Sequence, residues 1–337
     1  MVGTGGIGAG SFFLLTGNDS LGREESRGGR FLDRRDYCKL HIVSHYVKVL
    51  LGDGFPVFPI GKVGGDDAGR RLCAEMEAVG LDLRFVETVA DVDTLFSFCF
   101  LYPDGTGGNL TTEDSASARV DAAAIAAAEG LMHDLGPAGI ALAVPEVPLG
   151  ARRVLLDLAG RHGLYRAASF TRAEMGEARK TGLLDTVDLL GVNLEEAAAA
   201  AGLDRAGGTE ADLPAAVERV VGVFSWEHPK LALSITAGSR GSWSWDGSCL
   251  AHEPALAVRI EGTAGAGDAH LAGLLAGLAA GLTLAEAGQL AGIVAAASVT
   301  SPHAIHPDLG RQQLLSLCDA RVATAGSVRR LLSGGSP

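Results

Sequence analysis

The spacing of apolar positions alternates between two periods in the second part of the chain, from about residue 121 onward. Apolar runs of strand length recur there: GIALAVP (139–145), YRAASF (165–170), TVDLLGVN (186–193) and KLALSITAG (230–238). Longer segments with helical spacing lie between them: ARRVLLDLAGRHG (151–163), RAEMGEARK (172–180), EEAAAAAGL (195–203) and LPAAVERVVGVF (213–224). Strands separated by helices of this length are typical of βαβ units, so the pattern predicts a doubly wound, mostly parallel α/β sheet flanked by helices.

The first third of the chain follows a different pattern. Helical spacing over residues 38–51 is followed by an apolar strand candidate at 55–64 and by a second helix candidate at 66–81. In residues 83–112, aromatic and β-branched residues alternate with polar ones, which predicts two or three strands joined by turns such as PDGTGG. We expect these early β-rich pieces to lie outside the main sheet.

Two later segments complete the organisation. Residues 242–256 predict a β-rich ribbon, and the alanine-rich run 271–299 is apolar enough to suggest a membrane span. Glu286 stands at the middle of that run, so two buried helices explain it better. We therefore expect a single α/β domain over residues 1–337, with the end of the chain, SGGSP (333–337), as a flexible tail.

Composition narrows the classes of function. The formal net charge of −12 argues against nucleic acid or an anionic membrane as the main partner. The five cysteines are odd in number, are widely spaced and form no C-x-x-C, so they are typical of buried thiols in a reducing compartment. No basic segment followed by an apolar run opens the sequence, and we expect a cytoplasmic protein.

The glycine-rich start matches a nucleotide-binding pattern by its letters alone. Residues 3–8, GTGGIG, fit the G-x-G-x-x-G fingerprint of dinucleotide-binding folds. That fingerprint needs a strand before it, a helix after it and an acidic residue about 20 positions further on. Only Met1 and Val2 precede Gly3, and no long helical period follows it. An NAD(P)-dependent enzyme therefore ranks third among the functions considered.

The segment EGTAGAGDAHLAGLLAGLAAG (261–281) carries the clearest chemistry. Four small residues follow an expected extended strand, and a long helix is expected to begin at or just after Asp268. The amides of Gly265, Ala266 and Gly267 would then form an anion hole beside the Asp268 carboxylate. This pairing suits phosphoryl transfer, in which the carboxylate accepts the proton of an attacking hydroxyl while the amides and Mg²⁺ stabilise the transferring group. A plain glycine turn with Asp268 as helix cap is the alternative.

Several motifs together resemble the ribokinase-like (PfkB-type) carbohydrate kinases, from about Gly3 to about Leu315. Residues 263–268, TAGAGD, match the T-x-G-A-G-D signature of that family at every fixed position, and GKVGGDDAGRRL (61–72) is similar to its G-x-x-G-x-D-x-x-G segment. The resemblance implies a ribokinase-like fold with a β-strand lid, formed here by about residues 11–36 and 82–113. It also implies ATP and Mg²⁺ as cofactors, and leaves the need for a monovalent cation open.

The resemblance also implies roles for residues on the nucleotide side. GVNLEEA is similar to the family's N-x-x-E segment, in which Asn193 and Glu196 would help to hold Mg²⁺ and the phosphates, although Asn193 also suits a helix cap. SITAGSRGSW is similar to its nucleotide loop. The implied cofactor-binding set is completed by residues near the ATP: Thr236, Gly238, Gly241 and, as a candidate adenine contact or an exposed loop histidine, His303.

The departures from the family lie on the substrate side. Gly8 falls where the family has a substrate-binding Asp, so residues 3–10 are expected to end the first strand and to floor the substrate pocket. Leu40, His41 and His45 stand where the family has a G-G-x-x-x-N segment. The two histidines are candidate substrate contacts, with core or surface histidines as the favoured alternative. Three basic residues are further candidates for contact with a phosphate or an acidic group of the substrate: Arg172, Lys39 and Lys62.

These observations predict an ATP-dependent kinase that phosphorylates a hydroxyl of a small sugar or polyol, with Asp268 as general base. A nucleoside kinase on the same fold and a non-catalytic binding or regulatory member are the alternatives. The resemblance also makes a homodimer through the lid plausible. The first strand would be unusually short, which a truncated or misplaced start would explain.

Overall fold

The computed structural model describes residues 1–104, 106–203, 213–320 and 324–334. Its centre is a sheet in the order β13-β12-β11-β10-β9-β8-β1-β4-β5. Pairing is parallel from β5 to β11 and antiparallel from β11 to β13, which confirms the expected mostly parallel sheet. Its strands are β1 (Val2–Thr4), β4 (Phe58–Gly64), β5 (Phe85–Val89), β8 (Ile140–Ala143), β9 (Tyr165–Ala168), β10 (Leu189–Asn193), β11 (Ala232–Thr236), β12 (Ser242–Trp245) and β13 (Leu250–Glu253).

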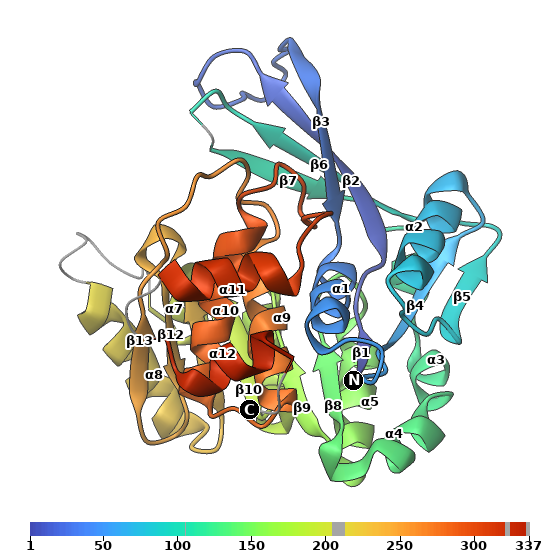
Figure 1. The fold of residues 1–337 in the computed structure, drawn as a ribbon. Coiled ribbons are helices and arrows are strands. Elements are labelled where there is room, and N and C mark those ends of the chain that lie inside the picture. The colour runs from blue at the N-terminus through green and yellow to red at the C-terminus, as the bar shows by residue number, and fades with distance from the viewer. Residues whose placement is uncertain (105, 204–212, 321–323, 335–337) are drawn as a thin grey trace.

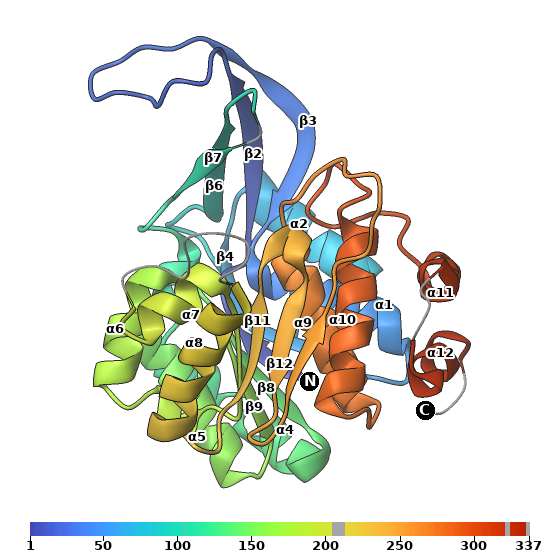
Figure 2. The same cartoon turned by 90° about the vertical axis from the view of Figure 1, so that its left-hand side faces the viewer.

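Helices cover both faces of this sheet, as Figure 2 shows with the sheet between two helical layers. One face packs against α1 (Lys39–Leu51), α2 (Asp67–Ala78), α9 (Ala266–Ala279), α10 (Leu284–Ser298), α11 (Arg311–Ala320) and α12 (Gly326–Leu332). The other packs against α3 (Ala122–Ala126), α4 (Glu129–Leu135), α5 (Leu149–Arg161), α6 (Arg172–Lys180), α7 (Leu194–Ala200) and α8 (Leu213–Glu227). Each layer has its own apolar core against the sheet, as expected for a doubly wound domain.

A second sheet, in the order β3-β2-β6-β7, projects from one edge of the domain and is called the lid here (Figure 1). Its strands are β2 (Gly8–Leu15), β3 (Gly29–Tyr37), β6 (Leu95–Leu101) and β7 (Gly107–Thr111). Side chains alternate across it: Ser97 and Cys99 face the domain, whereas Phe31, Phe96 and Leu110 are exposed on the outer face. The lid therefore exposes apolar side chains on its outer face and turns polar groups toward the domain.

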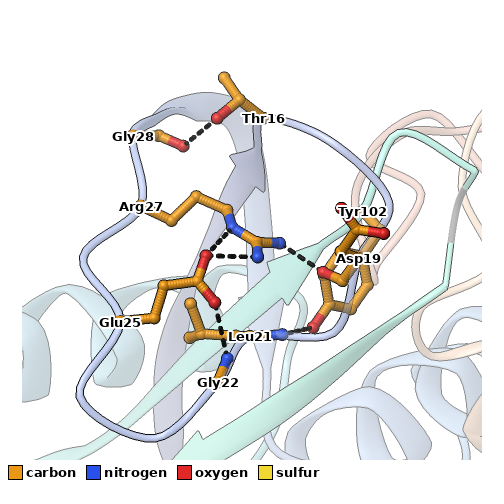
Figure 3. Close-up of polar contacts among 8 residues, drawn as sticks. All are labelled: Thr16, Asp19, Leu21, Gly22, Glu25, Arg27, Gly28 and Tyr102. Atoms are coloured by element: carbon orange, nitrogen blue, oxygen red, sulfur yellow. Dashed lines mark hydrogen bonds and ion pairs between the residues drawn. The ribbon is translucent and has the colours of Figure 1, made fainter.

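The long connection between β2 and β3 is held together by its own polar groups (Figure 3). Arg27 pairs with Glu25 and donates to the carbonyl of Asp19. The Leu21 amide donates to the Tyr102 hydroxyl at 2.8 Å, just beyond β6. The tip of the lid is thus tied to the neighbouring hairpin.

Three expectations about the elements need correction. The segment 82–113 was expected wholly in the lid, but β5 within it pairs with β4 at the edge of the main sheet. The ribbon expected at 242–256 is confirmed as β12 and β13, which join the opposite edge of the main sheet. Residues 254–260 form no strand, and α9 begins at Ala266, two residues before Asp268. Local periodicity finds such strands, but which sheet they join depends on tertiary pairing.

The apolar run from residue 271 forms α9 and α10, as expected, with extensive contact between them. Across the described ranges, no helix combines the length and the apolar character that crossing a membrane would require. Of the expected tail, residues 333–334 form a turn after α12, and 335–337 lie outside the described residues.

Candidate active site

A cleft of about 800 Å³ lies between the lid and the main domain. Its floor lies at the carboxyl ends of parallel strands, where ligands bind in open α/β sheets. Its lining comes from several parts of the chain: the end of β3 with the start of α1, the lid strands β6 and β7, residues 112–118, the loop after β8, and the starts of α6, α7 and α9. An inner pocket of about 190 Å³ continues toward β10 and β11 and shares Lys39, Glu196 and Asp268 with the cleft.

The turn before α9 depends on Gly265. Gly265 has φ 74°, a left-handed conformation that glycine adopts without strain, and an added Cβ would lie 2.7 Å from the carbonyl oxygen of Ala304. Among the described residues, the amides of Gly265, Gly267 and Asp268 have no hydrogen-bond acceptor, whereas that of Ala266 donates to Thr263 at 3.3 Å. Of the three amides that the sequence suggested, those of Gly265 and Gly267 are therefore free and that of Ala266 is not, and the amide of Asp268 is free as well.

Asp268 faces a lysine across the junction of the two pockets. Lys39 Nζ lies 3.1 Å from Asp268 Oδ1 and 3.1 Å from Ser169 Oγ. Burial alone would lower the pKa of Lys39, but the carboxylates of Asp268 and Glu196 outweigh it and raise that pKa. Lys39 is therefore a fixed positive charge beside the predicted base. The sequence offered it only as one of several basic residues.

Asn193 and Glu196 lie at the inner pocket, at the start of α7. Glu196 Oε2 accepts from the Asn193 amide at 2.8 Å, and Asn193 Oδ1 accepts from the Glu196 amide at 2.9 Å. They form a capping box, so the helix-cap interpretation of Asn193 is correct. Asn193 also pairs in register with Thr236 on β11. Burial, with Asp268 nearby, raises the pKa of Glu196, an oxygen site that a cation would stabilise.

Glu146 is a cleft residue that the sequence analysis missed. It lies in the loop three residues after β8 and has φ 76°, a left-handed conformation unusual for a residue with a side chain. Its Oε2 is buried with no hydrogen-bond partner among the residues that the structure describes, and burial, with Asp268 and Asp36 nearby, raises its pKa to about 7. Gly6 lies against it, since a Cβ there would be 2.5 Å from Glu146 Oε2. Gly6 of the fingerprint-like start thus makes room for this carboxylate. Its place after a strand was the available signal.

Asp36 is a second missed carboxylate, at the end of β3. The Cys99 thiol donates to its Oδ2 at 3.2 Å. Burial raises its pKa, and the charge of Asp268 acts in the same direction. Beside it, Ser97 Oγ donates to Asn109 Oδ1 at 2.6 Å. Lid and domain together thus present carboxylate, thiol, hydroxyl and amide groups to one space.

The arginine of this region is Arg152 rather than Arg172. Arg172 is exposed at the start of α6 and is not among the residues that line the cleft. Arg152 on α5 is fully buried, donates to the Ser169 carbonyl at 3.3 Å and pairs with Glu174, which lines the cleft. Burial lowers the pKa of Arg152. The buried guanidinium of Arg152 thus pairs with a carboxylate that lines the cleft. The sequence around Arg152 is that of an ordinary helix and gave no sign of this role.

Several predicted contacts lie elsewhere. Gly8 packs against Leu95 and Cys38 and does not line the cleft. His41 is buried in α1 with its ring 4.8 Å from that of Tyr37, and burial lowers the pKa of His41 to about 3 and of His45 to about 4. Neither histidine lines the cleft, so the favoured alternative is correct.

The remaining candidates are placed as follows. Lys62 pairs with Glu87 on β5 at 2.9 Å, away from the cleft. His303 Nδ1 accepts from the amide of Arg35 in the lid, so it does not project as a free loop histidine. Gly241 is required by packing, since a Cβ there would lie 2.0 Å from a carbonyl oxygen of β13, whereas Gly238 borders open space next to Thr236.

Comparison with known proteins gives one family. The sequence pattern of the pfkB family carbohydrate kinases matches residues 43–309. No curated protein matches the sequence.

Solved structures with this fold cover nearly the whole chain. One is ribokinase from Cryptococcus neoformans var. grubii serotype A in complex with ADP, with 19% identity, coverage of 95% of this chain and 99% of that one, and a TM-score of 0.76. A nucleoside kinase from Burkholderia thailandensis in complex with inosine has 18% identity, coverage of 95% and 98%, and a TM-score of 0.71. Arabidopsis thaliana ribokinase complexed with ribose and ATP has 18% identity, coverage of 94% and 97%, and a TM-score of 0.69. At these identities the likeness shows the fold.

Proposed function

The chain belongs to the pfkB family of carbohydrate kinases, and on that premise we propose that it transfers the γ-phosphate of ATP to a hydroxyl of a small sugar or polyol. One observation carries the proposal. Asp268 stands in the first turn of α9, beside the free amides of the helix start, with Lys39 at 3.1 Å. A base next to an anion site is what phosphoryl transfer needs, and a protein that only binds ligands gains nothing from it.

Each group then has a defined task. Asp268 accepts the proton of the attacking hydroxyl, and the amides of Gly267 and Asp268 donate to oxygens of the transferring phosphoryl group. Lys39 orients the Asp268 carboxylate and adds positive charge beside the phosphoryl path. Asn193, Glu196 and Thr236 border the inner pocket, where the nucleotide phosphates would enter. The presence of ADP and ATP in related solved structures supports ATP as donor.

Mg²⁺ fits the donor set at this pocket. Glu196 offers a carboxylate whose pKa is raised by burial, so that a cation beside it would stabilise its charged form, and Asn193 offers an amide oxygen. When bound, Mg²⁺ would neutralise phosphate charge.

A second cation site is proposed behind the anion turn. The carbonyl oxygens of Ser301 and Pro302 lie near Gly262, and that of Ala304 lies near Gly265. We therefore extend the proposal to a monovalent cation held by these carbonyl groups.

The acceptor side supports an acceptor without negative charge. Lys39 is the only cationic side chain among the described residues that line the cleft, and it is already paired with Asp268. The carboxylates that line the same cleft are Asp36, Glu113, Glu146, Glu174, Glu196 and Asp268. Sugar acids and sugar phosphates would be repelled by this set, whereas hydroxyl and amino groups would donate to it. The cleft volume of about 800 Å³ also accommodates a nucleoside, which keeps the nucleoside kinase as the second candidate.

The test is ADP release with Mg²⁺·ATP across neutral sugars, polyols, amino sugars, sugar acids and nucleosides. Asp268→Asn should abolish any acceptor-dependent signal. Asp67→Asn is the matched control, because Asp67 also stands in the first turn of a helix but is exposed and paired with Arg70. If ATP binds but no acceptor raises ADP release, the kinase proposal is wrong and a binding or regulatory role replaces it.

We also propose a homodimer formed through the lid. Phe31, Phe96 and Leu110 expose apolar surface on its outer face, where the rings of Phe13, Phe31 and Phe98 pack together. Light scattering should give twice the chain mass, and Phe31→Ser should shift it toward the monomer. We further propose a cytoplasmic location. All five cysteines are free, as is usual in a reducing compartment.

A further inference from the structure

The loop after α10 contacts the lid through two consecutive residues. His303 Nδ1 accepts from the backbone amide of Arg35 at 3.0 Å, and the backbone amide of Ala304 donates to the Arg35 carbonyl at 2.9 Å. Both backbone groups of a single residue in β3 are therefore satisfied by this loop. His303 is itself held, because its amide donates to Ser301 Oγ at 3.1 Å.

Arg35 stands where the lid is weakly paired. The register of β2 and β3 shifts between Ser11 and Phe12, so that Ser11 pairs with Arg35 but Phe12 pairs with Leu32. Asp33 and Arg34 are consequently extra residues in β3, and a bulge of this kind interrupts the ladder. The bonds from His303 and Ala304 support the strand at the point where its own sheet supports it least.

The residues that directly follow Arg35 in the sequence line the cleft. Asp36 and Lys39 line it, and Lys39 reaches Asp268. On its other side the same loop touches the anion turn, because the Ala304 carbonyl lies close enough to Gly265 that a Cβ would be 2.7 Å away. The loop thus stands between the root of the lid and the start of α9.

We propose that His303 is a positioning residue that fixes the root of the lid to the anion turn, so that Asp36 and Lys39 are held in register with Asp268. This assignment rests on the proposed kinase function. It replaces the expectation that His303 contacts adenine, since its Nδ1 already accepts a hydrogen bond from the lid. Nucleotide binding at the anion turn then tightens the lid root through Ala304 and His303.

Three variants separate the interpretations. His303→Ala removes the acceptor, whereas His303→Asn retains an oxygen acceptor close to the position of Nδ1. Arg35→Ala changes an exposed side chain, 62% accessible, and keeps both backbone groups. Hydrogen exchange of single amides is measured over residues 29–39, with and without Mg²⁺ and the non-hydrolysable analogue AMP-PNP. The affinity for AMP-PNP is measured by calorimetry.

In His303→Ala we expect exchange at the Arg35 amide to rise at least ten-fold, and protection of residues 35–38 by AMP-PNP to be lost. AMP-PNP affinity should change less than three-fold, and His303→Asn and Arg35→Ala should behave like the wild type. Unchanged Arg35 exchange in His303→Ala overturns the proposal. So does a ten-fold loss of AMP-PNP affinity with an unchanged lid, which would make His303 an adenine contact. A failed kinase function shows itself separately, as wild-type protein that releases no ADP with any acceptor, an outcome that does not depend on exchange at the Arg35 amide.

Discussion

The two sides of the cleft were predictable from the sequence to very different degrees. The anion turn, Asp268, Asn193, Glu196 and Thr236 lie together, as the sequence predicted. On the acceptor side, Gly8, His41, His45 and Arg172 do not line the cleft, and other residues take their place. The first side depends on local backbone requirements such as a left-handed glycine and a helix start. The acceptor side is assembled from segments that lie far apart in the sequence, so no local sequence pattern identifies its residues.

The largest effect is expected at the side that the sequence predicted. Asp268→Asn should lower kcat by about 10³-fold, because a positioned general base contributes roughly 10²–10⁴-fold and the variant also disturbs Lys39. ADP release with a coupled enzyme assay measures this. A loss smaller than about five-fold, with intact folding, would remove Asp268 from the role of base.

The next effect tests the buried guanidinium on the acceptor side. Arg152→Ala should lower the free energy of unfolding by about 3 kcal/mol, because it leaves Glu174 without its buried partner. Urea denaturation measures the change. Arg152→Met keeps much of the volume and controls for lost packing, and a variant as stable as the wild type would show that the pair contributes little.

The burial of Glu146 should make the stability of the folded state depend on pH. Burial raises its folded pKa to about 7 from 4.5, so the folded state binds its proton more tightly than the unfolded chain does. The resulting stabilisation is complete below about pH 4.5 and is lost as the pH rises through 7. Glu146→Gln, which stays neutral, should therefore match the wild type at pH 4.5 and exceed it by up to about 3 kcal/mol at pH 8. Thermal unfolding across this range measures the difference, and parallel curves for the two proteins would contradict the assignment.

Alanine substitutions at two glycines of the anion turn should have smaller effects, one on stability and the other on kcat. Gly265→Ala should cost about 1–2 kcal/mol of stability, because of its positive φ and the nearby Ala304 carbonyl. At Gly267 an added Cβ meets nothing within 4 Å, so Gly267→Ala should keep its stability. Its methyl group borders the inner pocket, and kcat should fall about ten-fold. Equal stability losses in both variants would contradict this division.

The smallest effect is expected at Arg172. Its exposed side chain lies outside the cleft, so Arg172→Ala should change kcat/KM by less than two-fold and leave the melting temperature within 1 °C or so. Steady-state kinetics beside Arg152→Ala provides the comparison. A ten-fold loss would restore the phosphate contact that the sequence suggested.

Much of the fold followed from periodicity, since β8 to β11 and the helices between them lie where apolar spacing placed them. The assignment of β5 to the lid was wrong, because strand periodicity does not specify a partner strand. Glu146 and Asp36 escaped detection because the position of one carboxylate at or after the end of a strand does not by itself distinguish a cleft residue from a surface residue. Their proximity to Asp268 is set by the packing of β1, β8 and the root of the lid. The glycines at residues 3–8 were visible in the sequence, but the space that Gly6 leaves for Glu146 was not.

The measurement that tests the central claim most directly is the identification of the product. Wild-type protein is incubated with Mg²⁺·ATP and the best acceptor from the panel, and the mixture is analysed by phosphorus NMR and mass spectrometry. The account predicts a phosphate ester of the acceptor in a one-to-one ratio with ADP, and formation of both products about 10³-fold more slowly with Asp268→Asn. Inorganic phosphate in place of the ester, or an ester formed equally well by Asp268→Asn, would contradict it.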